Sequence, residues 1–255
     1  MMKLAIMQPY FMPYIGYFQA IKAVDKYILY SNLNFIKEAW MNRNRVRQRD
    51  GRLCYIMVPL QHKSSNTLIF DILIDNSKHW RKDILNTILF SYKKSEYFEE
   101  IYPLLEGLLI TEVDSLTDLN ALTIMGISEF LDIPTVIESD YTRYFELEEN
   151  LKSVENDYSF YPYMEKTKPI KKVARVLEIC RREGADFFVN AIGGQSLYSK
   201  TEFAEYGISL NFVHTNSISY PQYGQEFVPN LSIIDVLMHN GKEGTKKLLD
   251  EYTLI

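Results

Sequence analysis

The first thirty residues constrain the fold most strongly, because they order a strand, a stiff loop, a helix and a second strand. Lys3–Gln8 is a short apolar run, followed by the proline-bounded loop Pro9–Pro13, a helical pattern over Tyr14–Ala23 and a strand pattern over Lys26–Tyr30. This order favours a parallel sheet. Open α/β sheets bind ligands at the carboxyl ends of their strands, so the proline loop is predicted to lie at the ligand-binding edge.

The remaining chain continues the α/β pattern around a more helical middle. Asn42–Arg49 alternates and Leu53–Leu60 is apolar, with Asp50-Gly51 between them, which predicts a basic β-hairpin. Further strands are expected over 67–74, 186–192 and 208–214, and helices over 78–93, 97–110, 115–131, 171–183, 201–206, 232–239 and 242–252. We therefore predict an α/β fold with a mostly parallel sheet, flanking helices, the basic hairpin and a helical middle and C-terminal annex.

The chain length of 255 residues fits one large domain. Within that domain we expect residues 1–75 and 170–255 to form the α/β core and residues 76–157 to form a helical insertion.

Composition limits the partners and the compartment. The chain has 28 basic and 33 acidic residues, a net charge of −5, which disfavours nucleic acid as a partner and restricts any anion site to a local cluster. Cys54 and Cys180 lie in separate apolar stretches, as expected of buried thiols in a reducing compartment. The longest apolar run is too short to cross a membrane. We expect a cytoplasmic protein with no membrane partner, and leave a homodimer open.

The proline loop carries the first candidate binding residues. Two prolines stiffen it, Gln8 places an amide at the strand end, and Gly16 lets a ligand or a backbone approach the helix start. Tyr10, Tyr14 and Tyr17 offer ring faces for stacking. A well-packed turn with buried tyrosines explains the same residues equally well.

A second candidate segment follows, from Asn34 to Arg52. Between Lys37 and Arg52 it holds six basic and two acidic residues, an excess of positive charge within an acidic chain. Guanidinium, ammonium, amide and indole groups could together hold a phosphate or carboxylate and stack a ring. Binding is favoured for Lys37, Trp40, Asn42, Arg43 and Asn44. The remaining charges Arg47, Arg49 and Arg52 are better explained as solvated strand charges.

A glycine-containing loop and the histidines complete the inventory. Gly193 and Gly194 follow a predicted strand, where backbone amides could cradle an anion, and Tyr198 lies just beyond. The loop lacks the pattern of a P-loop or a dinucleotide fingerprint. The four histidines and two cysteines show no metal-ligand spacing, so no metal site is expected.

Several of these segments together resemble the WbqC-like protein family. The resemblance is carried by the run from Gln8 to Phe18, by Phe35, Lys37, Trp40, Asn42, Arg43 and Asn44, by Pro59, Trp80 and Tyr92, and by Phe227, Pro229, Leu231, Ser232, Ile233, Asp235, Leu237, Asn240 and Gly241. It implies a bacterial cytoplasmic protein associated with genes for O-antigen, lipopolysaccharide and other surface polysaccharides. Such gene sets often contain enzymes that build nucleotide-linked amino sugars.

From the logic of such a pathway we hypothesise an enzyme that transfers an acyl or aminoacyl group, for example glycine, from a small donor to the amine of a nucleotide-linked sugar. A glycosyltransferase of the same pathway and a non-catalytic sugar-nucleotide-binding protein are the alternatives. The helix start at Tyr14-Ile15-Gly16-Tyr17 is similar, more weakly, to the His-x-Gly-His layout of adenylate-forming nucleotidylyltransferases, with tyrosine at both histidine positions. The cofactor is left open, with ATP as the candidate.

These hypotheses assign roles to individual residues. Catalytic roles are expected for Lys37, Arg43, Asn34, His62 and Asp235. Substrate binding is expected from Gln8, Tyr10, Tyr14, Gly16, Tyr17, Trp40, Asn42, Asn44, Gly193, Gly194, Tyr198, Tyr220 and Gln222. Among them, His62 and Asp235 are the candidates for a general base.

Overall fold

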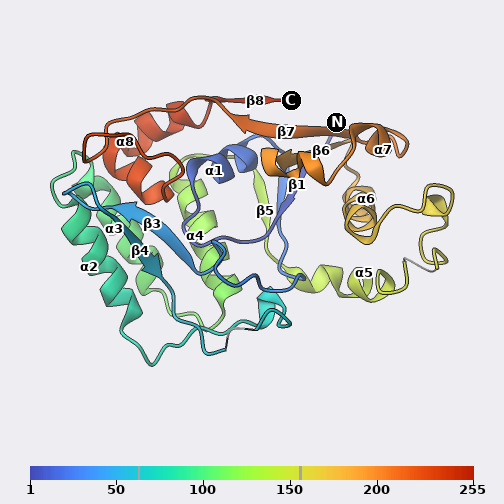
Figure 1. The fold of residues 1–255 in the computed structure, drawn as a ribbon, viewed down its shortest axis with the longest axis horizontal. Helices are drawn as coiled ribbons and strands as arrows, with labels where there is room; N and C mark the ends of the chain where they lie inside the picture. The colour runs from blue at the N-terminus through green and yellow to red at the C-terminus, as the bar shows by residue number, and fades with distance from the viewer. Residues whose placement is uncertain (63, 155–156) are drawn as a thin grey trace.

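The computed structural model describes residues 1–62, 64–154 and 157–255 as an α/β fold (Figure 1). Six strands form one sheet in the order β5-β2-β1-β6-β7-β8, and two form a separate antiparallel hairpin. The sheet strands are β1 (Lys3–Met7), β2 (Lys26–Leu29), β5 (Val136–Glu138), β6 (Phe187–Ala191), β7 (Ser209–Thr215) and β8 (Tyr252–Leu254), and the hairpin strands are β3 (Arg43–Arg47) and β4 (Leu53–Met57). Only β8 is antiparallel to its neighbour in the sheet, which confirms the predicted mostly parallel sheet.

The helices flank this sheet and form most of the middle of the chain. They are α1 (Ile15–Lys22), α2 (Trp80–Tyr92), α3 (Phe98–Ile110), α4 (Leu116–Phe130), α5 (Phe145–Asn150), α6 (Lys171–Glu183), α7 (Lys200–Ala204) and α8 (Ile233–Leu248). The predicted helix start at residue 115 is confirmed, because the Ser115 hydroxyl caps α4 and accepts from the Asp118 amide at 3.0 Å. The expected break between two C-terminal helices is a kink within α8 at Gly241, where φ is 62°.

The sheet separates two hydrophobic cores, because successive strand residues point to opposite faces. Tyr27 and Leu29 of β2 belong to the core with α1, the hairpin, α2–α4 and α8, whereas Leu4 and Ile28 belong to the core with α5–α7. In Figure 1 these two groups of helices lie at opposite ends of the molecule. The sheet is thus covered on both faces, as parallel sheets require.

Two local expectations were wrong, and two short elements were not predicted. The segment 67–74 is not a strand; it contains the 3-10 turn Ile69–Asp71, and its backbone makes only isolated bridges, such as Asn34 with Leu68. The last residues do not continue the helix, because Tyr252 and its neighbours pair with β7 as strand β8. Strand β5 and helix α5 were not expected, because both are too short for a recognisable periodicity.

The predicted basic hairpin is present, but its arginines do not form one solvated face. Strand β3 ends at Arg47, and Arg49 lies exposed beyond it. Arg47 is only 5% exposed, contrary to expectation. Its guanidinium donates to the Gly51 carbonyl and to Gln222 Oε1. The backbone at Gly224, where φ is 89°, passes so close to the Arg47 guanidinium that a Cβ on residue 224 would collide with the guanidinium.

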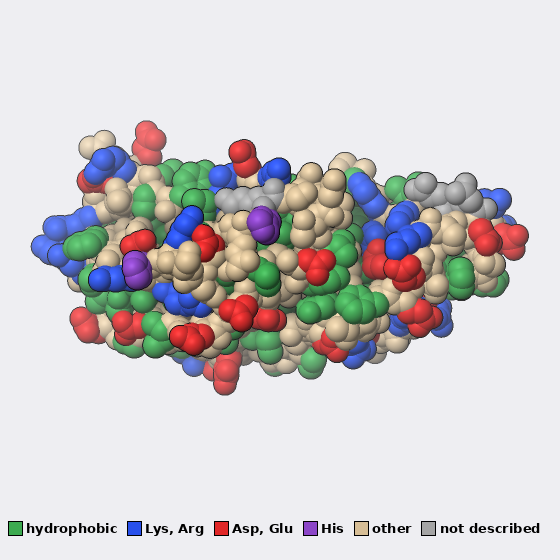
Figure 2. Space-filling view, turned by 90° about the horizontal axis from the view of Figure 1, so that it is seen from below, with side chains coloured by type: hydrophobic (Ala, Val, Ile, Leu, Met, Phe, Trp, Pro, Cys, Tyr) green, Lys and Arg blue, Asp and Glu red, His purple; other side chains and the backbone are tan. Residues whose placement is uncertain are grey.

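The surface carries charges of both signs. Figure 2 shows a face on which acidic and basic side chains are interspersed with apolar ones, so this face presents no broad basic field. Among the residues that the structure describes, no helix combines the length and apolar character needed to cross a membrane.

Candidate functional site

A cavity of about 730 Å³ opens at the carboxyl ends of β1, β6 and β7. In the strand order, β1 lies between β2, which follows it in the chain, and β6, which comes much later, so the connections reverse direction between β1 and β6. Ligands of open α/β sheets bind in the crevice outside such a switch point. The volume also falls in the range of about 300–1,000 Å³ that is usual for small-molecule sites.

We call this the proline-loop cavity and define it by its lining. The walls are Tyr10, Pro13, Tyr14, Ile15, Trp40, Asn44, Arg45, Ile192, His214, Thr215, Asn216, Ser217, Ile218, Tyr220, Phe227, Pro229, Asn230, Leu231 and Val236. They combine aromatic rings with hydroxyl and amide groups. The mixture suits a ligand with a flat or ring-shaped part and several polar groups.

The proline loop is fixed by buried amide side chains that reach its backbone. Asn44 Nδ2 on β3 donates to the carbonyl oxygens of Phe11 and Met12 at 3.1 and 2.7 Å. Asn120 Nδ2 on α4 donates to the carbonyl oxygens of Pro9 and Met41 at 3.0 and 2.8 Å. These bonds satisfy backbone groups that a loop cannot pair with itself, so the cavity wall is rigid before a ligand enters.

Two helix starts lie against the same cavity. Helix α1 begins at Ile15, and Tyr14 at its N-cap position supplies no side-chain cap. Helix α8 begins next to it, where the Ile233 amide donates to the Pro13 carbonyl at 2.8 Å and the Ser232 hydroxyl donates to the Met12 carbonyl at 2.8 Å. The positive end of α1 therefore faces a cavity wall.

Arg45 is the one formal charge in the described lining. Its guanidinium lies 5.3 Å from the centroid of the Trp40 ring, and its Nε has no hydrogen-bond partner among the described residues. None of the described lining residues is an aspartate or glutamate. Because an unpaired guanidinium with no neighbouring carboxylate attracts anions, the cavity favours a phosphate or carboxylate.

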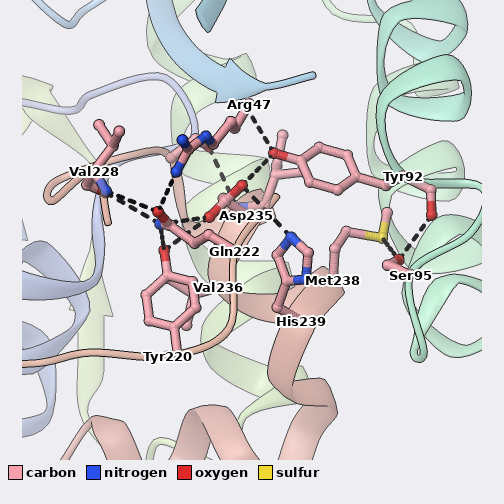
Figure 3. A network of polar contacts seen from close by, with 12 residues as sticks. Arg47, Tyr92, Ser95, Tyr220, Gln222, Val228, Asp235, Val236, Met238 and His239 are labelled. Carbon is pink, nitrogen blue, oxygen red and sulfur yellow. Dashed lines mark hydrogen bonds and ion pairs between the residues drawn. The ribbon is translucent and has the colours of Figure 1, made fainter. Parts of the chain in front are cut away.

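A buried polar network supports the cavity from behind (Figure 3). Asp235 of α8 is fully buried and accepts from the Tyr92 hydroxyl at 2.7 Å, the Tyr220 hydroxyl at 2.9 Å and Gln222 Nε2 at 2.9 Å. Gln222 Oε1 in turn accepts from Arg47 Nη1 at 3.1 Å. Tyr220 belongs to both the network and the cavity wall, so the network positions the segment that covers the cavity.

Burial controls protonation in this network. Burial raises the pKa of the Asp235 carboxyl above its ordinary value, although the hydrogen bonds from Tyr92, Tyr220 and Gln222 oppose the change. Burial lowers the pKa of His239, whose Nε2 lies 4.0 Å from Asp235 Oδ1, and the nearby carboxylate partly offsets that effect. Asp235 does not line the cavity, so its position gives it no direct route to a substrate.

The structure brings five of the predicted binding residues together. Tyr10, Tyr14, Trp40, Asn44 and Tyr220 all line the proline-loop cavity. The βα junction and the hairpin thus meet at one hollow, although they are about thirty residues apart in the chain.

Other predicted residues adjoin the cavity but serve its scaffold. Asn42 is buried, and its Nδ2 donates to the Val58 carbonyl at 2.9 Å. Tyr17 is buried and donates to the Gln8 carbonyl at 2.9 Å, so its ring is not free to stack on a ligand. A Cβ at Gly16 would collide with the Tyr14 ring, which means that Gly16 accommodates a side chain rather than a ligand.

The remaining predicted residues lie outside the described lining of this cavity. Arg43 donates to the Glu38 carbonyl and lies 5.2 Å from the Tyr55 ring, and Lys37 and His62 are exposed. Asn34 lines a second cavity. Gly193 and Gly194 form a 3-10 turn, in which a Cβ on Gly194 would collide with Asn190. Tyr198 packs on Phe188 and Phe203.

Sequence reasoning missed the polar residues at the end of β7. His214, Asn216 and Ser217 line the cavity, as does Asn230. Their signal was available, because His214 ends a predicted strand and strand ends form the binding edge. Arg45 lies in the second candidate segment but is not among the residues for which binding is favoured, because the two-residue spacing puts Arg43 and Arg45 on the same side of a strand and does not say which of them reaches a cavity.

Within residues 1–62, 64–154 and 157–255, no cluster of three or more histidine, cysteine, aspartate or glutamate side chains could hold a metal ion.

Known proteins match this chain over almost its whole length. The model of the WbqC-like protein family matches residues 8–247. The chain is 28% identical over 246 residues to a protein of Mycobacterium tuberculosis (strain ATCC 25618 / H37Rv) named "Uncharacterized protein Rv1507c", covering 95% of this chain and 96% of that protein. No solved structure matches the chain significantly.

Proposed function

This chain belongs to the WbqC-like protein family, and we propose that its proline-loop cavity binds a nucleotide-linked amino sugar and transfers an acyl or aminoacyl group, such as glycine, to the sugar amine. The observation that supports this most directly is Arg45, stacked on Trp40 with an unpaired Nε, in a lining without carboxylates. A diphosphate-linked sugar carries the negative charge that such a guanidinium would bind.

The lining offers partners for the other parts of this substrate. The rings of Tyr10, Tyr14 and Tyr220 can pack against a sugar or base face. Asn216, Ser217 and Asn230 supply amide and hydroxyl groups for sugar hydroxyls. Because Asn44 and Asn120 fix the loop backbone, these rings are held in place before binding, which reduces the entropy lost on association.

His214 is the candidate general base in this proposal. The amine nitrogen forms a bond to the carbonyl carbon of an activated donor, the donor's leaving group departs with the bonding electron pair, and the imidazole takes up the amine proton. His214 is exposed and belongs to the lining, and an imidazole nitrogen can accept a proton. It replaces His62, which is exposed outside the lining, and Asp235, which is buried behind it.

The test is incubation of the full chain with a panel of nucleotide-linked amino sugars and glycine or acyl donors, with and without ATP, followed by mass spectrometry. A mass gain equal to glycine minus water supports aminoacyl transfer, and the corresponding acyl gain supports acyl transfer. Release of free nucleotide with transfer of the sugar would instead favour a glycosyltransferase. Ligand binding without any product would favour a non-catalytic binding protein.

Matched variants separate binding from chemistry. Arg45→Ala should weaken nucleotide-sugar binding by about tenfold or more, the value of one charge-assisted contact, whereas Arg49→Ala, exposed on the same hairpin and outside the lining, should not. His214→Asn should retain binding and lose product formation, with His62→Asn as the control. Unchanged affinity in Arg45→Ala would remove the assignment of this cavity.

A further inference from the structure

A second cavity of about 830 Å³ lies near the end of β2 and the start of α6. Its lining is Asn32, Leu33, Asn34, Leu68, Phe70, Phe145, Glu148, Glu149, Lys152, Ile170, Lys171, Lys172 and Arg175. We call it the α6 cavity. It shares no described lining residue with the proline-loop cavity, and nothing in the proposed function uses it.

One wall of the α6 cavity holds uncompensated positive charge. Arg175 Nε is paired with Glu148 at 2.5 Å and Lys152 with Glu149 at 2.6 Å. Lys171 and Lys172 have no ion-pair partner among the described residues. Both lie in the first turn of the thirteen-residue helix α6, whose N-cap residue Ile170 provides no side-chain cap. Two free ammonium groups and the positive end of a helix therefore face the same space.

The buried side-chain amide of Asn32 in the lining uses its nitrogen but not its oxygen in hydrogen bonds within the described residues. Asn32 is only 5% exposed, and its Nδ2 donates to the Tyr141 carbonyl at 3.0 Å. Its Oδ1 has no hydrogen-bond partner among the described residues. Buried acceptors are almost always paired, since an unpaired one loses its hydration without compensation. The free oxygen can therefore accept a hydrogen bond from an N–H or O–H group of a ligand.

Another part of the lining is aromatic. The rings of Phe70 and Tyr141 are stacked with centroids 4.7 Å apart and an interplanar angle of 1°, and the Phe145 ring lies 5.4 Å from Phe70. Phe145 is 44% exposed and lines the cavity. An exposed ring braced by two others offers a fixed flat face, which binds a planar group at little entropic cost.

We propose that the α6 cavity is a nucleotide site: the phosphates bind Lys171, Lys172 and the start of α6, the base packs on Phe145, and an exocyclic amine of the base donates to Asn32 Oδ1. A nucleotide whose base carries such an amine would contact all three: the two lysines at the start of α6, the Phe145 ring and Asn32 Oδ1. Adenine nucleotides serve as the probe. A simple phosphate would leave the aromatic wall and Asn32 unused. The inference does not depend on the identity of the ligand in the proline-loop cavity.

Calorimetric titration of the full chain with ATP, AMP, adenosine and tripolyphosphate tests this site. ATP should bind more tightly than AMP, and both more tightly than adenosine. The double variant Lys171→Ala/Lys172→Ala should weaken ATP binding by about tenfold to a hundredfold, the effect of losing one or two charge-assisted contacts. Lys166→Ala removes an exposed lysine just before α6 that lies outside the lining, and should leave affinity unchanged.

The aromatic and phosphate contributions separate with one further variant. Phe145→Ala should weaken ATP and AMP binding by about threefold to tenfold and leave tripolyphosphate binding unchanged. Unchanged ATP affinity in Phe145→Ala would show a phosphate site alone, and equal losses for tripolyphosphate and ATP would show that the ring does not contact the base; either result would overturn the nucleotide assignment.

The same titrations distinguish failure of this proposal from failure of the proposed function. ATP binding that is lost in Arg45→Ala but retained in Lys171→Ala/Lys172→Ala would place the nucleotide in the proline-loop cavity and overturn the α6 site. No heat with any of the four probes would also overturn it. The first result would support nucleotide binding in the proline-loop cavity, whereas the second leaves the proposed function to its own test, in which a nucleotide-linked sugar is titrated into the parent chain and Arg45→Ala.

Discussion

The two cavities lie on one molecule but are built from different interactions. The proline-loop cavity is held by neutral side chains that reach backbone carbonyls, such as Asn44 to Phe11 and Ser232 to Met12. The α6 cavity is held by ion pairs, chiefly Glu148 with Arg175. Neutral hydrogen bonds inside a packed core fix a shape that salt hardly changes, whereas a partly exposed ion pair weakens as ionic strength rises.

The cavities also differ in how their charge is balanced. Arg45 has no acidic neighbour in its lining, while the α6 cavity holds two glutamates and four basic side chains. In the first, a single guanidinium can determine which ligands enter. In the α6 cavity, the two lysines Lys171 and Lys172, unpaired within the described part of the chain, would determine which ligands enter. Perturbing one scaffold should therefore leave the other cavity intact, and the predictions below test that separation.

The largest effect is expected from Asp235→Ala, which removes the acceptor of three buried hydrogen bonds. The hydroxyls of Tyr92 and Tyr220 and Nε2 of Gln222 would lose this acceptor. We expect the free energy of unfolding to fall by about 3–5 kcal/mol, measured by urea denaturation. Asp250→Ala, which removes an exposed partner of Lys22, is the control and should show no measurable change.

The same variant tests the separation of the two cavities. At a temperature where Asp235→Ala remains folded, it should lose nucleotide-sugar binding, because Tyr220 and its segment are no longer held, and keep ATP binding in the α6 cavity. Loss of both together would mean that the two scaffolds are coupled.

A smaller effect is expected from Arg175→Met on the other scaffold. Glu148 would keep its hydrogen bond from the Tyr30 hydroxyl but lose its ion pair with Arg175. The Arg175 and Glu148 side chains are 12% and 19% exposed, so water partly compensates for the lost ion pair. We expect a loss of about 2 kcal/mol in the free energy of unfolding, with proline-loop binding unchanged. Lys152→Met, which breaks the exposed pair with Glu149, should have no measurable effect; a comparable loss there would contradict this account.

The smallest effect concerns pH. The pKa of folded His239 lies below its ordinary value of 6.5 because of burial, so the unfolded chain binds the proton more readily. The free energy of unfolding should therefore fall as pH drops below about 6.5, by at most about 1.4 kcal/mol per pH unit for one proton. The raised pKa of Asp235 acts in the opposite sense, and Arg47 disfavours protonation of His239.

The variant His239→Gln separates the pH dependence that His239 causes from the pH dependence that Asp235 causes. The variant should show a flatter decline in unfolding free energy below pH 6.5 than the parent chain, measured by urea denaturation at several pH values. Parallel curves for the two proteins would show that His239 does not contribute.

Much of the fold follows from local patterns. The strand, loop, helix and strand order at the start predicts the parallel pairing of β1 with β2, and the alternation before Asp50-Gly51 predicts the β3–β4 hairpin. Ser115 and Gly184 mark a helix start and a helix end as expected. Three-residue strands such as β5 escape prediction because their stability comes from neighbours in the sheet and not from their own sequence.

The candidate sites were predictable only in part. Tyr10, Tyr14 and Trp40 stand out by residue type and reach the cavity, yet Asn42 and Tyr17 belong to equally distinctive segments and are buried in the scaffold. The same amide or phenol can bind a ligand or satisfy a backbone carbonyl. Which one it does depends on partners far away in the chain.

Arg45 and Arg47 show which properties the sequence determines by itself and which only the tertiary structure determines. The two-residue spacing alone places both arginines on one side of a strand, and the sequence by itself predicts the hairpin and the local excess of positive charge. The fold decides the rest, because the segment with Gln222 and Gly224 packs over Arg47 and leaves Arg45 beside an open cavity. A side chain's own chemistry sets what it can bind, but long-range packing sets which groups remain unpaired to do so.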